Sequence, residues 1–223
     1  MIEIKNLNKI YLKGKKNMVH ALNNINLKID DRETVAIIGE SGAGKSTLLH
    51  IMSCIDNFDG EYYLDNIDIN KLSESKKSKL RSSKIGIVLQ DFALIDDFTV
   101  FENVMTPLYF NKKIKDKKGS VMRALKKTGI VSLKAKKVSQ LSGGQKQRVA
   151  ISRALVTNPE YIFADEPTGS LDSKTSEEIV KMLFDLNRNG ITIVIVTHNL
   201  EIANQCHHII EIKDGNIIKD ICS

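Results

Sequence analysis

A glycine-rich loop follows the apolar stretch that ends at Ile38. It fits the pattern G-x-x-x-x-G-K-[ST] and leads into a helical pattern. Glycines let a backbone wrap closely around a phosphate chain, whose oxygens then meet amides and a helix N-terminus. Lys45 should reach the β- and γ-phosphates, and the Ser46 hydroxyl should bind Mg²⁺. The loop predicts a phosphate site made of Gly39, Ser41, Gly42, Ala43, Gly44, Lys45, Ser46 and Thr47.

A pair of acids, Asp165 and Glu166, ends a second apolar stretch that begins at Tyr161. Open α/β sheets place their ligands at such strand ends. Beside a phosphate loop, Asp165 fits as the carboxylate that holds the Mg²⁺ shell. Glu166 fits as the group that orients or deprotonates an attacking water. The alternative for Glu166 is an ordinary surface acid at a strand end.

A third motif is Leu141-Ser142-Gly143-Gly144-Gln145, followed by a helical pattern through Leu155. It resembles the signature motif of the ATP-binding cassette (ABC) ATPases, and the order of all the motifs matches that family. The resemblance covers essentially the whole chain and implies ATP and Mg²⁺ as ligands. It also implies four further roles: Tyr11 stacks on adenine, Gln90 touches Mg²⁺ or the attacking water, Asp172 belongs to the D-loop, and His198 is the switch histidine.

The signature motif is a second device for binding phosphate. Ser142 stands where a helix should start, and such a terminus carries positive partial charge and free N–H groups. One chain cannot easily aim this device and the Lys45 loop at the same nucleotide. The resemblance implies two chains packed head to tail, with Ser142, Gly143, Gly144 and Gln145 of one facing the γ-phosphate held by the other.

The patterning of the chain indicates how these motifs are positioned. Apolar and polar residues alternate near the N-terminus, as in half-exposed antiparallel strands, whereas Thr34–Ile38, Tyr161–Ala164 and Ile191–Val196 are continuously apolar, as in buried parallel strands. Between residues 91 and 140 the pattern is helical and rich in Lys. This is an α/β pattern. The resemblance implies a P-loop NTPase with a RecA-like core, an antiparallel β subdomain and an inserted α-helical subdomain.

The resemblance also implies one ABC ATP-binding domain over residues 1–223. Its nucleotide-binding core and β subdomain would occupy about 1–90 and 150–223, and the helical subdomain with the signature motif about 91–149.

The composition is that of a globular chain of 223 residues, with 42% hydrophobic and 27% charged residues and a net charge of +6. Disorder and a small disulfide scaffold are therefore excluded. No apolar run is long enough to span a bilayer, and the N-terminus does not resemble a signal peptide. We expect a cytoplasmic protein that reaches the cytoplasmic face of the membrane through a partner.

Several residues carry no clear chemical signal. The spacing of Cys54, Cys206 and Cys222 matches no metal or redox motif, so we interpret Cys54 as a core residue and the other two as incidental. His207 and His208 are expected on the surface. The basic cluster Lys112–Lys118 has no firm role, although contact with anionic lipid head groups would suit its charge.

The resemblance narrows further to one group of cassettes. Four segments look like the ATPases of macrolide export, lipoprotein release and antimicrobial-peptide (bacteriocin) export or resistance: Gly39–Gly42, Phe92–Ile95, Thr99–Val104 and Asp165–Asp172. The resemblance implies a bacterial ATPase subunit that works with an integral membrane permease on a separate chain.

Other functions remain as alternatives. A cell-division cassette is a neighbouring possibility. The basic charge favours a soluble cassette acting on nucleic acid or the ribosome, but the segment before the signature is too short for the long coiled coils of DNA-repair relatives, so no nucleic acid is expected. The signature motif argues against a different P-loop enzyme, such as a kinase or GTPase. The complete set of catalytic residues argues against an inactive binding module.

Overall fold

The alternating N-terminal residues form an antiparallel sheet in the computed structural model, which describes residues 1–12, 14 and 17–222. Ile2 and Ile4 are buried, whereas Lys5 is exposed, as a period of two requires. The register pairs Ile2 with Ile29 on one side and with Leu64 on the other. In the order β2-β1-β4-β5, the strands are β2 (Val19–Ile29), β1 (Ile2–Tyr11), β4 (Asp59–Leu64) and β5 (Ile67–Asp68).

The continuously apolar stretches form a larger, mostly parallel sheet. Its neighbouring strands are parallel except for the pair β9 and β10. The carboxyl ends of the parallel strands therefore meet at one edge, which is where the chemical motifs follow. In the order β10-β9-β3-β8-β7-β6, the strands are β10 (Asn216–Cys222), β9 (His208–Lys213), β3 (Thr34–Ile38), β8 (Thr192–Val196), β7 (Tyr161–Asp165) and β6 (Ile85–Val88).

Both faces of this sheet are buried, which explains its unbroken apolar sequences. On β7, Ile162 and Ala164 belong to one hydrophobic cluster, whereas Tyr161 and Phe163 belong to the other. The first cluster contains the apolar residues of α5 (Gly143–Leu155), and the second those of α1 (Lys45–Met52). These two helices therefore pack on opposite faces of the sheet.

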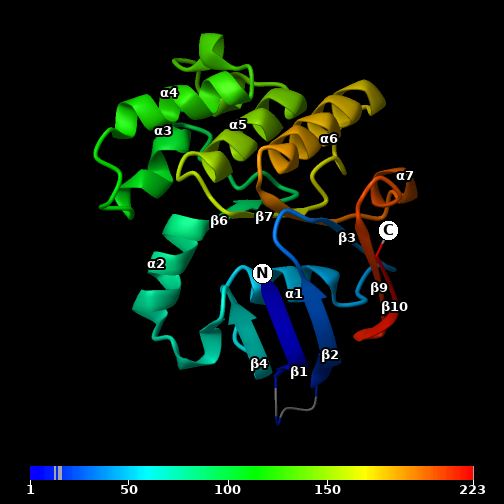
Figure 1. The fold of residues 1–223 in the computed structure, drawn as a ribbon. Helices are drawn as coiled ribbons and strands as arrows, with labels where there is room; N and C mark the ends of the chain where they lie inside the picture. Colours follow the sequence, from blue (N-terminus) through cyan, green and yellow to red (C-terminus); the bar gives the residue numbers. More distant parts are fainter. Residues whose placement is uncertain (13, 15–16, 223) are drawn as a thin grey trace.

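The remaining helices lie around the sheets (Figure 1), with α3, α4, α5 and α6 gathered on one side. The predicted helical segment 91–140 is confirmed as α3, α4 and three short 3-10 helices. The other α-helices are α2 (Glu74–Lys84), α3 (Val100–Met105), α4 (Lys117–Lys127), α6 (Ser173–Arg188) and α7 (Leu200–Ala203). The 3-10 helices are η1 (Ile69–Lys71), η2 (Thr106–Tyr109), η3 (Val131–Leu133) and η4 (Val138–Gln140).

The structure corrects the expectation that both His207 and His208 lie on the surface. His207 is exposed, as expected, but the prediction that His208 lies on the surface is wrong: its side chain is only 2% exposed, and its ring lies against the side chains of Asp220 and Glu33. Within the described residues, none of the helices combines the length and the apolar character that a membrane crossing requires.

Candidate functional site

The phosphate loop joins β3 to α1, and its glycines hold conformations that other residues rarely adopt. Gly39 has φ +146° and Gly44, which caps α1, has φ +106°. A Cβ atom at Gly39 would lie 2.1 Å from a carbonyl oxygen, and one at Gly44 would lie 2.4 Å from another. Only glycine fits at these two positions, so the tight turn into α1 depends on them.

Lys45 is held over this loop by the backbone. Its Nζ donates hydrogen bonds to the carbonyl oxygens of Gly39, at 2.9 Å, and Glu40, at 2.7 Å. Ser46 and Thr47 follow in the first turn of α1. The ammonium group and the start of a helix therefore converge on one spot, which is an arrangement suited to an anion.

The register of the large sheet brings the other motifs beside this loop. Val196 of β8 pairs with Ile37 of β3 on one side and with Asp165 of β7 on the other. The phosphate loop begins two residues after Ile37, and His198 lies two residues after Val196. The loop, Asp165 and His198 therefore lie side by side at one edge of the sheet.

Glu166 has the most constrained geometry of the site. Its φ is +44°, and its N–H donates to the carbonyl oxygen of Val196 at 2.9 Å. Its Oε1 lies 3.0 Å from Nδ1 of His198, a residue whose side chain is 73% exposed. Its other oxygen, Oε2, is buried and has no hydrogen-bond partner among the described residues. An unpaired buried carboxylate oxygen is costly, so Glu166 is set up to accept a hydrogen bond from a group outside the protein.

Gln90 lies beside the same turn. It follows β6 two residues after Val88, which pairs with Ala164 of β7. A Cβ atom built on Gly169 would lie 3.6 Å from Nε2 of Gln90 and 3.5 Å from Cβ of Glu166. Gln90 and Glu166 thus flank the same small residue.

Tyr11 ends β1, and its hydroxyl group is tied to the protein. The hydroxyl donates a 2.6 Å hydrogen bond to Oδ2 of Asp56, and Nζ of Lys9 lies 4.7 Å from the ring centroid. Burial raises the pKa of Tyr11, and its hydroxyl also lies beside Thr47 of the phosphate loop. The ring is therefore fixed in orientation close to the loop.

The signature segment starts α5, as its sequence predicts. Ser142 caps the helix: its hydroxyl accepts from the N–H of Gln145 at 3.4 Å, and Oε1 of Gln145 accepts from the N–H of Ser142 at 3.2 Å. A Cβ atom at Gly144 would lie 2.4 Å from Cγ2 of Thr175, and one at Gly143 would lie 3.4 Å from Leu171. The glycines therefore allow α5 to approach the start of α6.

Asp172 caps α6. Its carboxylate accepts hydrogen bonds from the N–H of Thr175 at 3.0 Å and from the Thr175 hydroxyl at 2.7 Å, and these bonds lower the pKa of Asp172. The signature segment and Asp172 thus meet through Thr175. Because α5 and α1 pack on opposite faces of the sheet, the helix that the signature segment starts does not share a face with the helix of the Lys45 loop.

Sequence reasoning missed Arg153, whose side chain is hydrogen-bonded to the loop after Gln90. Its guanidinium group donates to the carbonyl oxygens of Phe92, at 2.7 Å, and Ala93. Both of those residues have positive φ values, at 62° and 45°. The side chain of Arg153 is largely enclosed, and this burial lowers its pKa. Its place on the helix that follows the signature motif is the only signal the sequence offers.

Comparisons with known proteins agree with this arrangement. The family described as ABC transporter matches residues 22–169. The macrolide export ATP-binding/permease protein MacB of Mannheimia succiniciproducens is 45% identical over 222 residues, which cover 99% of this chain and 34% of MacB. The uncharacterized ABC transporter ATP-binding protein MJ0796 of Methanocaldococcus jannaschii is 44% identical over 227 residues, which cover 99% of this chain and 96% of that protein.

The fold comparison leads to the same family. A dimeric structure of the ATP-binding cassette MJ0796, in a post-hydrolysis state bound to ADP and Pi, has a TM-score of 0.91 and 42% identity, and the match covers 100% of this chain and 98% of that one. The chain spans about a third of the length of MacB and nearly all of MJ0796. The chain belongs to the ABC transporter family and is one of its ATP-hydrolysing cassettes.

Proposed function

We propose that this cassette drives a membrane permease by hydrolysing ATP at the edge where β3, β8, β7 and β6 end. The observation that carries the proposal is the buried Oε2 of Glu166, which has no hydrogen-bond partner in the described part of the chain and lies next to His198 and the phosphate loop. A buried acceptor at this place is suited to a water molecule that attacks the terminal phosphate.

ATP would bind with its phosphates in the loop 39–47 and its adenine against Tyr11. Lys45 would exchange part of its bonding to Gly39 and Glu40 for the β- and γ-phosphate oxygens. Three oxygen donors fit Mg²⁺: the Ser46 hydroxyl, the Asp165 carboxylate and the Gln90 amide. When bound, Mg²⁺ would neutralise charge on the phosphates.

Glu166 would orient the attacking water through Oε2 and accept its proton. His198 would hold the Glu166 carboxylate in place, since Nδ1 of His198 lies 3.0 Å from Oε1 of Glu166. The positive φ of Glu166 and its backbone bond to Val196 fix the direction of the side chain. These residues supply position and charge rather than a covalent bond, which is what phosphoryl transfer requires.

A second copy of the chain would complete the site. Ser142, Gly143, Gly144 and Gln145 lie on a helix across the sheet from the Lys45 loop, so they suit the nucleotide of a facing chain. Asp172 would approach the same interface, because it contacts the signature segment through Thr175. The solved structures of MJ0796 are dimeric, which supports pairing between two copies of this chain.

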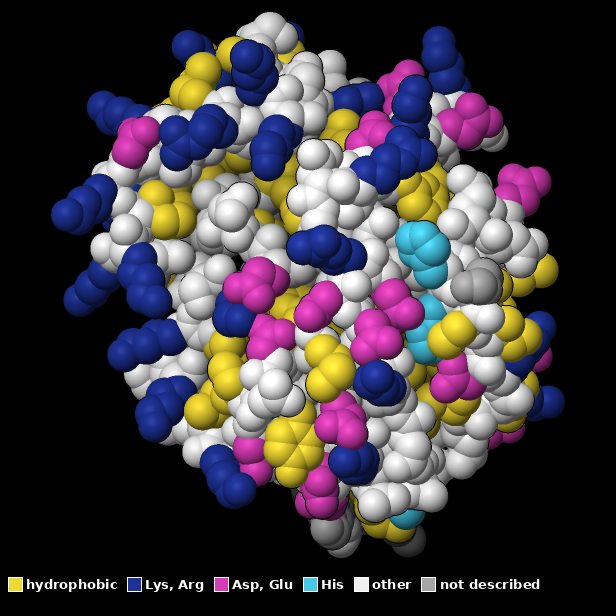
Figure 2. Space-filling view, viewed as in Figure 1, with side chains coloured by type: hydrophobic (Ala, Val, Ile, Leu, Met, Phe, Trp, Pro, Cys, Tyr) yellow, Lys and Arg dark blue, Asp and Glu magenta, His cyan; other side chains and the backbone are white. Residues whose placement is uncertain are grey.

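A cytoplasmic segment of the permease would dock on an apolar groove of about 340 Å³ beside β6. Ile55, Leu89, Pro107 and Phe110 line this groove, and Phe110 is 71% exposed. Arg153 also lines it and holds the loop after Gln90, so docking there would act on the site. Figure 2 shows Lys and Arg side chains gathered over α4 and α2 on this side, a distribution that suits the anionic surface of a membrane.

The names of the relatives support export as the direction of transport. Those named MacB are macrolide export proteins with ATP-binding and permease parts in one chain, whereas MJ0796 has nearly the length of this cassette. We propose an integral membrane permease on a separate chain as the partner, with a macrolide, an antimicrobial peptide or a lipoprotein as the substrate class. A cell-division cassette, and a soluble cassette that acts on nucleic acid or the ribosome, are the competing candidates.

A pull-down from detergent-solubilised membranes tests the proposal. We expect a tagged cassette to capture an integral membrane permease, and Phe110→Ser to lose it. Ile218→Ser, which changes an apolar residue 55% exposed on β10, is the matched control and should keep the partner. Recovery with ribosomes or nucleic acid, and without a permease, would contradict the proposal.

A further inference from the structure

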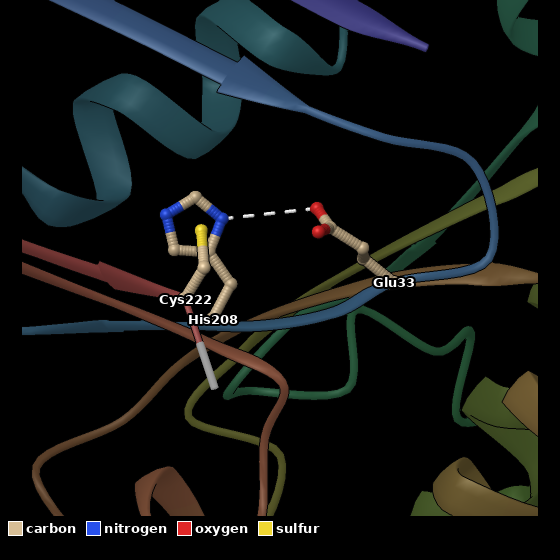
Figure 3. A group of neighbouring side chains, drawn as sticks. All are labelled: Glu33, His208 and Cys222. Atoms are coloured by element: carbon tan, nitrogen blue, oxygen red, sulfur yellow. Dashed lines mark ion pairs between the residues drawn. The ribbon is translucent and has the colours of Figure 1, made fainter.

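Three residues from distant parts of the chain meet at the amino end of β3 (Figure 3): Glu33, His208 and Cys222. The sheet register explains why. His208 pairs with Cys222 of β10 and with Val35 of β3, and Glu33 is two residues before Val35, so it shares that face. One ligand atom from each of the three side chains lies within 4.8 Å of the others.

His208 is prepared to act as a ligand. Its side chain is 2% exposed, and its Nε2 lies 2.5 Å from Oδ1 of Asp220. A carboxylate beside Nε2 accepts a hydrogen bond from the N–H at that position, which leaves the lone pair of the neutral ring on Nδ1. That Nδ1 atom is buried, has no hydrogen-bond partner among the described residues and lies 3.7 Å from Oε2 of Glu33. A carboxylate that orients a histidine in this way is the usual outer support of a metal-bound imidazole.

The other two donors lie beside this nitrogen. Oε2 of Glu33 is held by the N–H of Asp30 at 2.9 Å. Cys222 pairs directly with His208 in the register of β9 and β10, so its sulfur lies beside the imidazole. A cation among these groups would favour the thiolate form of Cys222.

We propose that Glu33, His208 and Cys222 bind a transition-metal dication, with Zn²⁺ as the best fit to one oxygen, one nitrogen and one sulfur donor. The thiol proton passes to solvent when Cys222 binds the metal, and a water molecule fills the fourth position. Asp220 is a positioning residue that orients His208. The metal ties β10 to β9 and to the start of β3.

This site is separate from the nucleotide site. The phosphate loop follows the carboxyl end of β3, whereas Glu33 precedes its amino end, and a strand of this length spans roughly 15 Å. Metal binding here can therefore be measured without ATP, and it does not depend on the ATPase mechanism proposed above.

Zn²⁺ titration of the nucleotide-free protein, in competition with a chromogenic chelator, tests the proposal. We expect the chain to bind one equivalent, and Co²⁺ to give the charge-transfer absorption of a thiolate ligand. Cys222 is exposed, whereas Cys54 and Cys206 are buried, so a thiol reagent reports on Cys222. Zn²⁺ should slow that reaction.

Variants locate the metal. Cys222→Ser should lose the Co²⁺ thiolate absorption and most of the affinity, and Asp220→Asn should weaken binding by about 10–100-fold. Asp214→Asn, in the turn between β9 and β10, removes a matched charge outside the cluster and should bind as the unaltered chain does. His198→Ala should also bind normally. Equal Zn²⁺ affinity in the unaltered chain and Cys222→Ser, or no slowing of the Cys222 reaction, would overturn the proposal.

Discussion

Nδ1 of His198 lies 3.0 Å from one carboxylate oxygen of Glu166, while the other oxygen of Glu166 is buried and has no hydrogen-bond partner among the residues that the structure describes. The two residues follow neighbouring strands, β8 and β7. Oε1 thus holds the side chain against His198, and Oε2 is available to the attacking water. The first prediction rests on these different roles of the two oxygens.

Glu166→Gln should retain ATP binding but lose turnover by about 10²–10⁴-fold, because an amide cannot accept the proton of the attacking water. The variant should also accumulate as a nucleotide-bound dimer. Phosphate release and size-exclusion chromatography with ATP measure the two effects. Glu201→Gln, an exposed acid at the start of α7, is the control. Normal turnover in Glu166→Gln would refute the role given to Glu166.

Lys45→Ala should weaken ATP binding by about 10–100-fold, because a charged hydrogen-bond donor to the phosphates is lost. Isothermal titration calorimetry measures the change. Lys213→Ala, an exposed lysine at the end of β9, should leave the affinity unaltered. If both variants bind ATP equally well, Lys45 does not contact the phosphates.

Gly144→Ala should destabilise the fold by about 1–3 kcal/mol, because the new methyl group would lie 2.4 Å from Cγ2 of Thr175. Thr175→Ser removes that methyl group and keeps the hydroxyl that bonds Asp172. The double variant should therefore recover most of the stability in urea unfolding. No recovery would show that the contact between α5 and α6 is not the cause.

Acid should destabilise the fold through Asp65. Burial by itself would raise the pKa of Asp65, but hydrogen bonds from Lys84, Tyr161 and the Met1 amine outweigh it and lower the pKa to about 2. The pKa of Asp65 in the folded chain is thus below its value of about 3.9 in the unfolded chain. The contribution of Asp65 to the free energy of unfolding is therefore complete above pH ~4 and is lost as the pH falls toward 2.

The expected loss is on the order of 1 kcal/mol, because the partly exposed group is screened by solvent. Unfolding free energies measured across this pH range should fall for the unaltered chain and fall less for Asp65→Asn. Parallel curves for the two proteins would exclude this contribution.

The sequence alone was sufficient for those features that depend on neighbouring residues. The sequence predicts that Ser142 starts a helix, and Ser142 caps α5, because this cap needs only Ser142 and Gln145. The alternating and continuous apolar patterns predicted the antiparallel β1 and β2 and the buried β3, β7 and β8. Weaker local patterns left β4 and α2 unpredicted.

Only the tertiary structure decided which distant residues meet. The register that pairs Asp165 with Val196 sets the distance between Glu166 and His198, and no local pattern encodes it. The local pattern indicates a surface residue at His208, yet its side chain is buried in the fold, and the pairing of β9 with β10 brings it to Cys222. Sheet order and register arise from packing across the whole chain, so these contacts became visible only in the fold.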